Sequence, residues 1–159
     1  MPKRPAFLTI LLIIILTAIS AALGAVVSGG SDDAWYAALN KPAFNPPDIV
    51  FGIVWPILFT LMAIGAVLVR LKAGSFGTAS SALGLYFTQL AVGIGWSWLF
   101  FGFHQLIYAM VALVILWLLI LAMMRSFARH SWVAAVLQLP YFAWISFASV
   151  LNASLLVLN

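Results

Sequence analysis

Long apolar segments alternate with short polar ones along the whole chain. Each apolar segment has about 20 residues, the length of an α-helix that crosses a bilayer. The five segments lie at about residues 6–28, 48–70, 79–102, 106–126 and 131–157. No internal repeat relates them, which argues against a transporter built from inverted repeats. The pattern predicts an all-α membrane protein, a five-transmembrane-helix bundle that forms a single domain over residues 1–159.

The longest polar joint, residues 29–47, differs from the others. It runs into the second helix through WYAALNKPAFNPPDIVFGIVW at 35–55, where prolines and aromatic residues crowd together. Pro46 and Pro47 are placed to begin that helix, where a missing N–H costs nothing. Tyr36 and the tryptophan before it supply flat amphipathic rings. Two alternatives stay open: a stiff lid over the mouth of the bundle, or a loop whose rings anchor it at the lipid headgroups.

The composition agrees with a membrane location. Of the 159 residues, 66% are hydrophobic and only 6% are charged, whereas soluble domains carry about 25% charged residues. The mean hydropathy is +1.20. Cysteine is absent, which excludes disulfides, thiolate metal sites and cysteine nucleophiles. His104 and His130 lie at joints, where a lone histidine is more often solvated than a metal ligand, so no metal site is predicted.

The charges predict the orientation in the membrane. Six of the seven basic residues share one side of a five-helix topology, namely Lys3, Arg4, Arg70, Lys72, Arg125 and Arg129. The other side carries Lys41 and the three acidic residues, Asp32, Asp33 and Asp48. Basic residues concentrate on the cytoplasmic side of membrane proteins, so we expect a cytoplasmic N-terminus and an external C-terminus. The scattered basic residues form no patch that would suit a nucleic acid.

The start of the chain resembles a signal peptide, because Lys3 and Arg4 precede an apolar run. That run is longer than the apolar region of a typical signal peptide. We therefore expect the first segment to be retained as a helix.

The second and third segments offer surfaces that could face a ligand. In the third, Gln89, Gly93 and Trp96 share one side at 100° per residue. A buried amide needs hydrogen-bond partners, so we expect Gln89 to point into the bundle, toward another helix or a ligand. In the second, Phe51 and Trp55 lie one turn apart.

The opposite side of the third segment carries small residues. Ala91, Gly95 and Gly102 lie there, and small residues let another helix backbone approach closely. The seam is equally compatible with packing inside one chain and with a homodimer contact.

The fifth segment contains LPYFAWISFASVLN at 139–152. Pro140 should kink the helix, because it removes one backbone hydrogen bond. The large ring of Trp144 lies one turn from the small Ala148, which leaves space for a ligand beside the ring, and Tyr141 lies next to them. Trp144 falls near the middle of the span, so an interfacial aromatic belt does not account for it.

Three motifs together resemble the TspO/MBR family, which comprises tryptophan-rich sensory proteins and the mitochondrial translocator protein. They are WYxxLxKPxFxPPxxxFxxVW at 35–55, QLxxxxxWSxxFFG at 89–102 and PYxxWxxFAxxLN at 140–152. The resemblance covers nearly the whole chain, and three motifs in the right order make a specific signal. It implies a five-helix bundle, often dimeric, with a cavity open toward the first loop. It also implies binding of porphyrins such as protoporphyrin IX, with no required cofactor.

The resemblance further implies a set of ligand-binding residues. They are Tyr36, Pro42, Phe51, Trp55, Gln89, Gly93, Trp96, Tyr141, Trp144 and Ala148. Within this set, Trp55 and Trp144 match the tryptophans that face the bound ring, and Tyr36 and Pro42 belong to the lid loop. Ala91 and Gly95 match the family's dimer contact in the third helix.

Two features depart from the family pattern. Gly93 stands where the family usually has asparagine, which removes a polar contact from the cavity and adds room. The end of the fifth segment, LNASLLVLN, has neither the tyrosine nor the basic residue of the sterol pattern in animal members. We therefore expect no dedicated sterol site.

These features predict a receptor or carrier for a flat amphipathic tetrapyrrole. Some bacterial members of the family promote light- and oxygen-dependent porphyrin breakdown, for which Trp144 is the candidate redox residue. A regulatory protein that acts through partners and a passive transporter remain as alternatives. The sequence shows no hydrolytic triad, nucleotide-binding loop or metal cluster, so a conventional enzyme is not expected. We expect a bacterial plasma membrane, although some members occupy outer membranes.

Overall fold

The computed structural model describes residues 5–28 and 33–159, and in these residues it is built from helices. The helices are α1 (Ala6–Val27), α2 (Ala34–Ala38), α3 (Asp48–Ala73), α4 (Phe76–Ser97), a π-helix η2 (Trp98–Gly102), α5 (Leu106–Ala128), α6 (Trp132–Val136) and α7 (Leu139–Leu158). They form five spans that are long and apolar enough to cross a membrane, with η2 extending α4 and α6 joined to α7. The predicted all-α bundle of five transmembrane helices is therefore confirmed.

The ends of the long helices follow local chemistry. Pro47 is the N-cap of α3, next to the position where proline is preferred. Gly74 ends the same helix with a φ of +75°, a left-handed conformation that glycine adopts without strain. Ser75 then accepts a hydrogen bond from the backbone N–H of Thr78 at 3.1 Å and so caps α4.

The fifth span is interrupted where the sequence predicted a kink. α6 ends at Val136, α7 begins at Leu139, and Pro140 lies in the first turn of α7. Proline is tolerated there because the N–H it lacks would have had no partner inside the helix. Within this interruption, the backbone N–H of Gln138 donates to the carbonyl of Ala135 at 3.0 Å.

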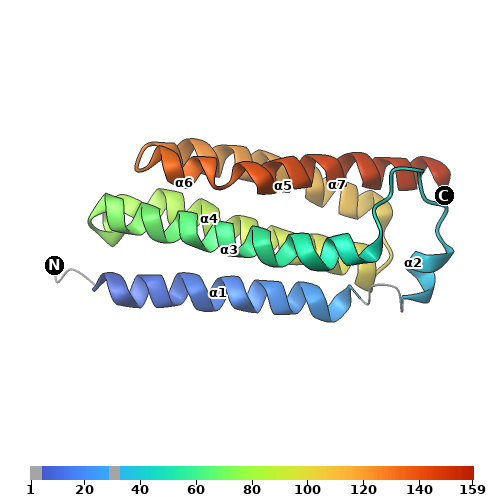
Figure 1. The fold of residues 1–159 in the computed structure, drawn as a ribbon, viewed down its shortest axis with the longest axis horizontal. Helices are drawn as coiled ribbons and strands as arrows, with labels where there is room; N and C mark the ends of the chain where they lie inside the picture. The colour runs from blue at the N-terminus through green and yellow to red at the C-terminus, as the bar shows by residue number, and fades with distance from the viewer. Residues whose placement is uncertain (1–4, 29–32) are drawn as a thin grey trace.

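The helices run side by side along the long axis of the molecule (Figure 1). α1 packs beside α3 and α4, and α5 packs between α4 and α7. The short helix α2 and the C-terminus lie at one end of the bundle, and the first residues of α1 lie at the other. We call the end that carries α2 the loop end.

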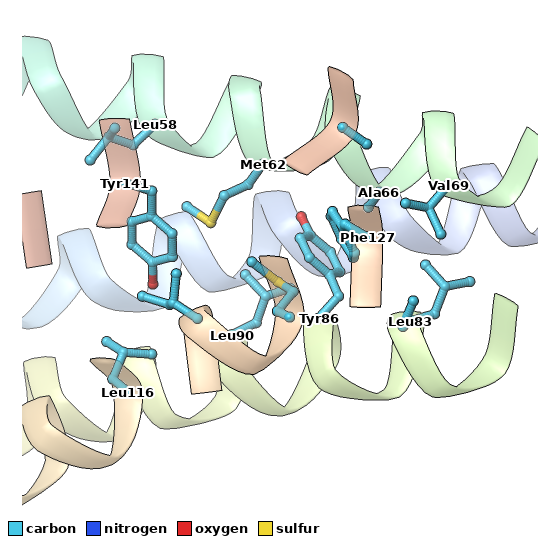
Figure 2. Close-up of a cluster of buried hydrophobic side chains, with 14 of the residues drawn as sticks. Leu58, Met62, Ala66, Val69, Leu83, Tyr86, Leu90, Leu116, Phe127 and Tyr141 are labelled. Carbon is cyan, nitrogen blue, oxygen red and sulfur yellow. The ribbon is translucent and has the colours of Figure 1, made fainter. Parts of the chain in front are cut away.

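The main hydrophobic core occupies the half of the bundle away from the loop end. Figure 2 shows its side chains meeting between α3 and α4, with Tyr141 at one end of the cluster and Val69 and Leu83 at the other. The buried residues of α3 begin only at Leu58, ten positions after the helix starts, so the loop half of the bundle is less completely filled. One polar pair joins this core to α1, because the hydroxyls of Thr17 and Tyr86 lie 2.6 Å apart.

Candidate ligand-binding cavity

A cavity of about 760 Å³ occupies the loop half of the bundle. Its lining comes from α1, α2, α3, α4, η2 and α7. Its volume lies in the range of about 300–1,000 Å³ that is typical of small-molecule sites. The cavity exists where the tight core between α3 and α4 gives way to larger, half-buried aromatic residues.

Tryptophan and tyrosine rings make one wall of the cavity. The ring centroids of Trp55 and Trp144 lie 6.5 Å apart at an interplanar angle of 86°. Trp55 also lies 6.1 Å from Trp96 and 6.4 Å from Tyr141. Phe51 meets the edge of Trp144 at 5.6 Å. Because each ring contacts at least one other, the wall is rigid and presents both faces and edges of aromatic rings to the cavity.

A buried hydrogen-bonded pair makes the floor. The hydroxyl of Tyr141 donates to Oε1 of Gln89 at 2.8 Å, and Gln89 is fully buried. Nε2 of Gln89 donates to the sulfur of Met62 at 3.6 Å. The amide that the sequence singled out therefore points into the bundle and already has protein partners.

Gly93 lies directly above this floor. A Cβ atom at Gly93 would lie 3.9 Å from the Tyr141 hydroxyl, which is ordinary van der Waals contact. The position therefore has room for a side chain, and the glycine enlarges the cavity beside Tyr141 and Gln89.

Helix α2 and the chain that follows it cover the loop end. The carboxylate of Asp33 caps α2 by accepting from the backbone N–H groups of Trp35 and Tyr36 at 3.0 and 3.1 Å. The Trp35 ring stacks on His104 with centroids 4.2 Å apart, and the Tyr36 ring lies 5.7 Å from Phe101. These contacts hold the described part of the loop against η2 and the residues that follow it.

A hydrogen-bonded clasp joins the loop to the end of α7. The backbone N–H of Asn40 donates to Oδ1 of Asn159 at 2.9 Å, and Nδ2 of Asn159 donates back to the carbonyl of Asn40 at 3.0 Å. Nδ2 of Asn40 donates to the carbonyl of Leu158 at 3.3 Å. Nothing in the sequence pattern indicated this clasp, because its partners lie 118 and 119 positions apart.

The charges at the mouth are arranged unevenly. Asp48 lines the cavity, whereas Lys41 does not. Nζ of Lys41 donates to the carbonyls of Ala37 and Leu39, both at 3.3 Å, and lies 4.7 Å from the centroid of the Tyr36 ring. The cation is thus directed at the end of α2 and at the aromatic ring, not at the cavity.

Tyr36 keeps its proton at neutral pH. Burial raises the pKa of its phenol above the ordinary value; the hydrogen bond with Asn45 acts in the opposite direction, and the Asp48 carboxylate raises the pKa further. The phenol donates to Oδ1 of Asn45 at 3.4 Å. The loop therefore carries a neutral phenol at this end of the bundle.

The structure brings nine of the ten residues of the predicted ligand set to the cavity. They are Tyr36, Phe51, Trp55, Gln89, Gly93, Trp96, Tyr141, Trp144 and Ala148. Pro42 is not in the lining, and its carbonyl instead accepts a hydrogen bond from the backbone N–H of Asn45 at 3.0 Å. Pro42 shapes the turn of the loop rather than the wall.

Helix α1 and its C-cap residue contribute lining residues that sequence reasoning missed. They are Ser20, Ala21, Ala22, Gly24, Ala25 and Ser28. The only signal in the sequence is the run of small residues that closes the first apolar segment, AISAALGA. Asp48 and Asn152 also line the cavity and were not singled out as ligand contacts.

The small-residue seam of α4 divides into two parts. Ala91 and Gly95 are exposed on the outer face of the helix, and a Cβ at Gly95 would meet nothing within 4 Å. A Cβ at Gly102 would lie 3.0 Å from Cγ2 of Val27 and 3.3 Å from Cε3 of Trp98. Gly102 therefore packs toward α1 in the same chain, whereas Ala91 and Gly95 have no such neighbour there.

No group of three or more histidine, cysteine, aspartate or glutamate residues that could hold a metal occurs among residues 5–28 and 33–159. The cavity lining in that part of the chain is mostly apolar and aromatic, and Asp48 is its one residue with a charged side chain at neutral pH. The arrangement suits a flat apolar ligand with few polar groups.

Comparison with known proteins gives a consistent result. The chain matches the TspO/MBR family over residues 10–158. It is 39% identical to the tryptophan-rich protein TspO of Chlorobaculum tepidum over 125 residues, which cover 79% of each chain. It is 37% identical to protein CrtK of Rhodobacter capsulatus, over 89% of this chain and 87% of the relative. It is 35% identical to the translocator protein of Bos taurus, over 87% and 82% of the two chains.

Proposed function

Because the chain belongs to the TspO/MBR family, we propose that it is a membrane receptor or carrier that binds porphyrins, such as protoporphyrin IX, or similar flat hydrophobic ligands. The observation that carries this proposal is the aromatic wall of the 760 Å³ cavity, where Trp55, Trp96 and Trp144 line one space. A planar macrocycle gains affinity by leaving water and by lying against such rings.

The wall also limits how the ligand lies. The Trp55 and Trp144 planes are nearly perpendicular, at 86°. A flat ligand that stacks on one of these rings is therefore nearly perpendicular to the other ring. It can contact that second ring only in an edge-to-face arrangement. This geometry favours a planar molecule, which can lie flat against one ring and meet the other ring with an edge contact.

The proposal extends to light- and oxygen-dependent breakdown of the bound porphyrin, with oxygen as the oxidant. Trp144 supports this extension, because its indole lines the cavity in contact with Phe51 and Trp55. We therefore propose Trp144 as the residue that exchanges an electron with the light-excited ligand.

The first experiment is a titration of the detergent-solubilised protein with protoporphyrin IX, in the dark and then under light. Tryptophan fluorescence and the porphyrin absorption bands are followed together. Saturable quenching is expected, and its absence would contradict porphyrin binding. Loss of the porphyrin bands in light, dependent on oxygen, would support breakdown, and saturable quenching without bleaching would leave a receptor or carrier.

We also propose an orientation with the loop end outside a bacterial plasma membrane. Arg70, Lys72 and Arg125 lie in the last turns of α3 and α5, at the end of the bundle opposite the lid. Since the natural chain contains no cysteine, single cysteines can report the topology. A membrane-impermeant maleimide should label Ala43→Cys on intact cells and Ala128→Cys only after permeabilisation, and the reverse pattern would invert the orientation.

A further inference from the structure

The wall of the cavity is incomplete on one side. Five of its lining residues are exposed, and all five belong to α1 or α3, whereas every lining residue of α4, η2 and α7 is buried or half-buried. Ala22 and Ala25 lie on the α1 side, and Gly52 and Pro56 lie on the α3 side. We call the opening between these four residues the α1–α3 slot; the fifth exposed residue, Asp48, lies at the mouth.

The slot faces lipid rather than water. Its immediate neighbours on α1 are Leu23 and Val26, which are 39% and 76% exposed, and on α3 Ile53 and Ile57, which are 56% and 53% exposed. Large apolar side chains turned outward on a spanning helix mark a lipid-facing surface. Pro56 lies eight positions into α3, or about 12 Å along a helix that rises about 1.5 Å per residue. The slot therefore reaches into the hydrocarbon layer.

The α1–α3 slot can widen with the loss of few packing contacts. All four rim residues are small or lack a flexible side chain, and a Cβ at Gly52 would meet nothing within 4 Å. The buried residues of α1 are Thr9, Ile13, Thr17 and Ser20, so none lies in its last seven positions. The loop half of α1 can thus move away from α3 by giving up mainly the contact of Val27 with Gly102, while the Thr17–Tyr86 hydrogen bond keeps the other half in place.

The aqueous mouth is a poorer route. The clasp between Asn40 and Asn159 and the stacking of Trp35 on His104 must be broken to lift the lid. The carboxylate of Asp48 lines the mouth, and Lys41 is directed away from it. A hydrophobic ligand would also have to pass through water, in which it dissolves poorly.

We propose that the ligand reaches the cavity from the hydrocarbon of the bilayer, through the α1–α3 slot. The ligand class is then an apolar planar molecule that dissolves in the membrane and carries few charged groups. This inference rests on the proposed function, since it describes how the ligand of the same cavity arrives. The lid becomes a fixed cover over the polar end of the ligand, and α1 becomes the moving part.

The test measures exchange rates across the slot. The protein is reconstituted in liposomes and mixed with donor liposomes that contain protoporphyrin IX dimethyl ester, a membrane-dissolved probe. Tryptophan quenching gives the association rate, and transfer to empty acceptor liposomes gives the dissociation rate. Gly52→Phe and Ala22→Phe place a ring in the slot from opposite sides, so one informative variant remains if the other fails to fold. Ile53→Phe adds the same ring on the neighbouring lipid-facing position.

We expect association and dissociation to slow together by about tenfold in Gly52→Phe and Ala22→Phe, because the added ring must be displaced at each passage. Ile53→Phe should match the wild type. Faster dissociation with unchanged association would mean that these residues are only wall contacts, and it would overturn the inference. A separate variant, Asn159→Ala, loosens the lid. If it accelerates exchange several-fold while the slot variants behave like the wild type, the mouth is the route and the inference is wrong.

The equilibrium titration separates this inference from the function on which it rests. If the wild type shows no saturable binding of either the dimethyl ester or protoporphyrin IX, porphyrin binding itself is wrong. If it binds and the slot variants exchange at the wild-type rate, only the route is wrong.

Discussion

Trp144 and Trp55 both line the cavity but have different aromatic neighbours. Trp55 contacts four other aromatic residues that line the cavity, namely Phe59, Trp96, Tyr141 and Trp144, so a smaller ring there would loosen the whole wall. Trp144 contacts Phe51, Trp55 and Phe147, and a phenylalanine in its place would keep most of these edge contacts. Trp144 is therefore the better position for separating chemistry from binding.

We predict that Trp144→Phe slows light-dependent bleaching of protoporphyrin IX by at least about tenfold, while binding weakens by less. The reason is that phenylalanine retains an aromatic surface but is much harder to oxidise than an indole. The measurement is the bleaching rate in light at saturating porphyrin, together with the dark titration. The control is Trp132→Phe, because Trp132 is 71% exposed and outside the cavity. Bleaching at the wild-type rate would remove Trp144 from the redox role.

Asp48 provides a second test at single-residue scale, on the charge of the ligand. We predict that Asp48→Asn raises the affinity for protoporphyrin IX, a diacid, by about threefold, which corresponds to removing one like charge at several ångströms in a solvated mouth. The affinity for the dimethyl ester should not change. The comparison requires titrations of both ligands at low and high salt, since screening should shrink the effect.

Asp33→Asn is the matched control for this test. It removes the same charge at the same end of the bundle, Asp33 does not line the cavity, and asparagine caps a helix as well as aspartate does. If both variants raise diacid binding equally, only the net charge of the surface matters. An equal gain for the ester in Asp48→Asn would show that the effect is not electrostatic.

At the scale of elements, the sequence predicted what hydrophobic length and proline placement control. The five spans and the start of α3 after Pro47 follow from these two signals. The structure differs from the prediction in elements that depend on contacts between residues distant in sequence, and in elements too short to give a hydrophobic pattern. Helix α2 depends on one cap at Asp33, and η2 appears as a wider turn in which the N–H of Phe103 donates to the carbonyl of Trp98 at 2.8 Å.

In the candidate site, too, some residues could be predicted from the sequence and others could not. Residues with a distinctive side chain in an apolar background, such as Gln89 and Trp144, stand out in the sequence and line the cavity. The contribution of α1 did not stand out, because alanine and glycine in an apolar helix look the same whether they face lipid, a helix or a hollow. Only the placement of α1 beside α3 and α4 decides between these surroundings.

Close packing between α3 and α6 gives a prediction at this scale. A Cβ at Gly65 would lie 3.1 Å from the carbonyl oxygen of Ala134 and would collide with Nε2 of Gln138. Gln138 is fully buried and donates to the carbonyls of Leu61 and Ala134 at 3.4 and 3.3 Å. We predict that Gly65→Ala destabilises the protein by about 1–3 kcal/mol, the usual effect of overpacking, and lowers the thermal unfolding midpoint in detergent.

Gly93→Ala is the matched comparison. Its Cβ has ordinary contact distance to Tyr141, so the gain in helix propensity of up to about 1 kcal/mol should prevail. The unfolding midpoint should therefore stay the same or rise. A fall of equal size in both variants would mean that these glycines are retained for helix flexibility and not for close packing.

For the whole molecule, the remaining question is how the outer face of α4 is covered. Exposed small residues follow this face at alternating spacings of three and four, a pattern that lets a second helix approach closely. They are Gly77, Ser81, Gly84, Thr88, Ala91 and Gly95. By contrast, the outward residues of α5 include Val114, Ile115 and Leu118, which are 49%, 47% and 55% exposed and present a bulky surface suited to lipid chains. We propose that a second copy of the chain packs against α4 to form a homodimer.

We predict that Gly95→Phe converts the dimer to a monomer, because the added ring holds two α4 helices apart where a Cβ now has no neighbour within 4 Å. Leu118→Phe, on the outer face of α5, should leave the oligomeric state unchanged. Chemical cross-linking in native membranes and light scattering of the detergent complex measure the difference. Since a single chain already forms the cavity, the monomeric variant should still bind protoporphyrin IX. If Gly95→Phe loses both dimerisation and porphyrin binding, pairing along α4 holds Gln89, Trp96 and the rest of that wall in position. The cavity would then depend on the dimer.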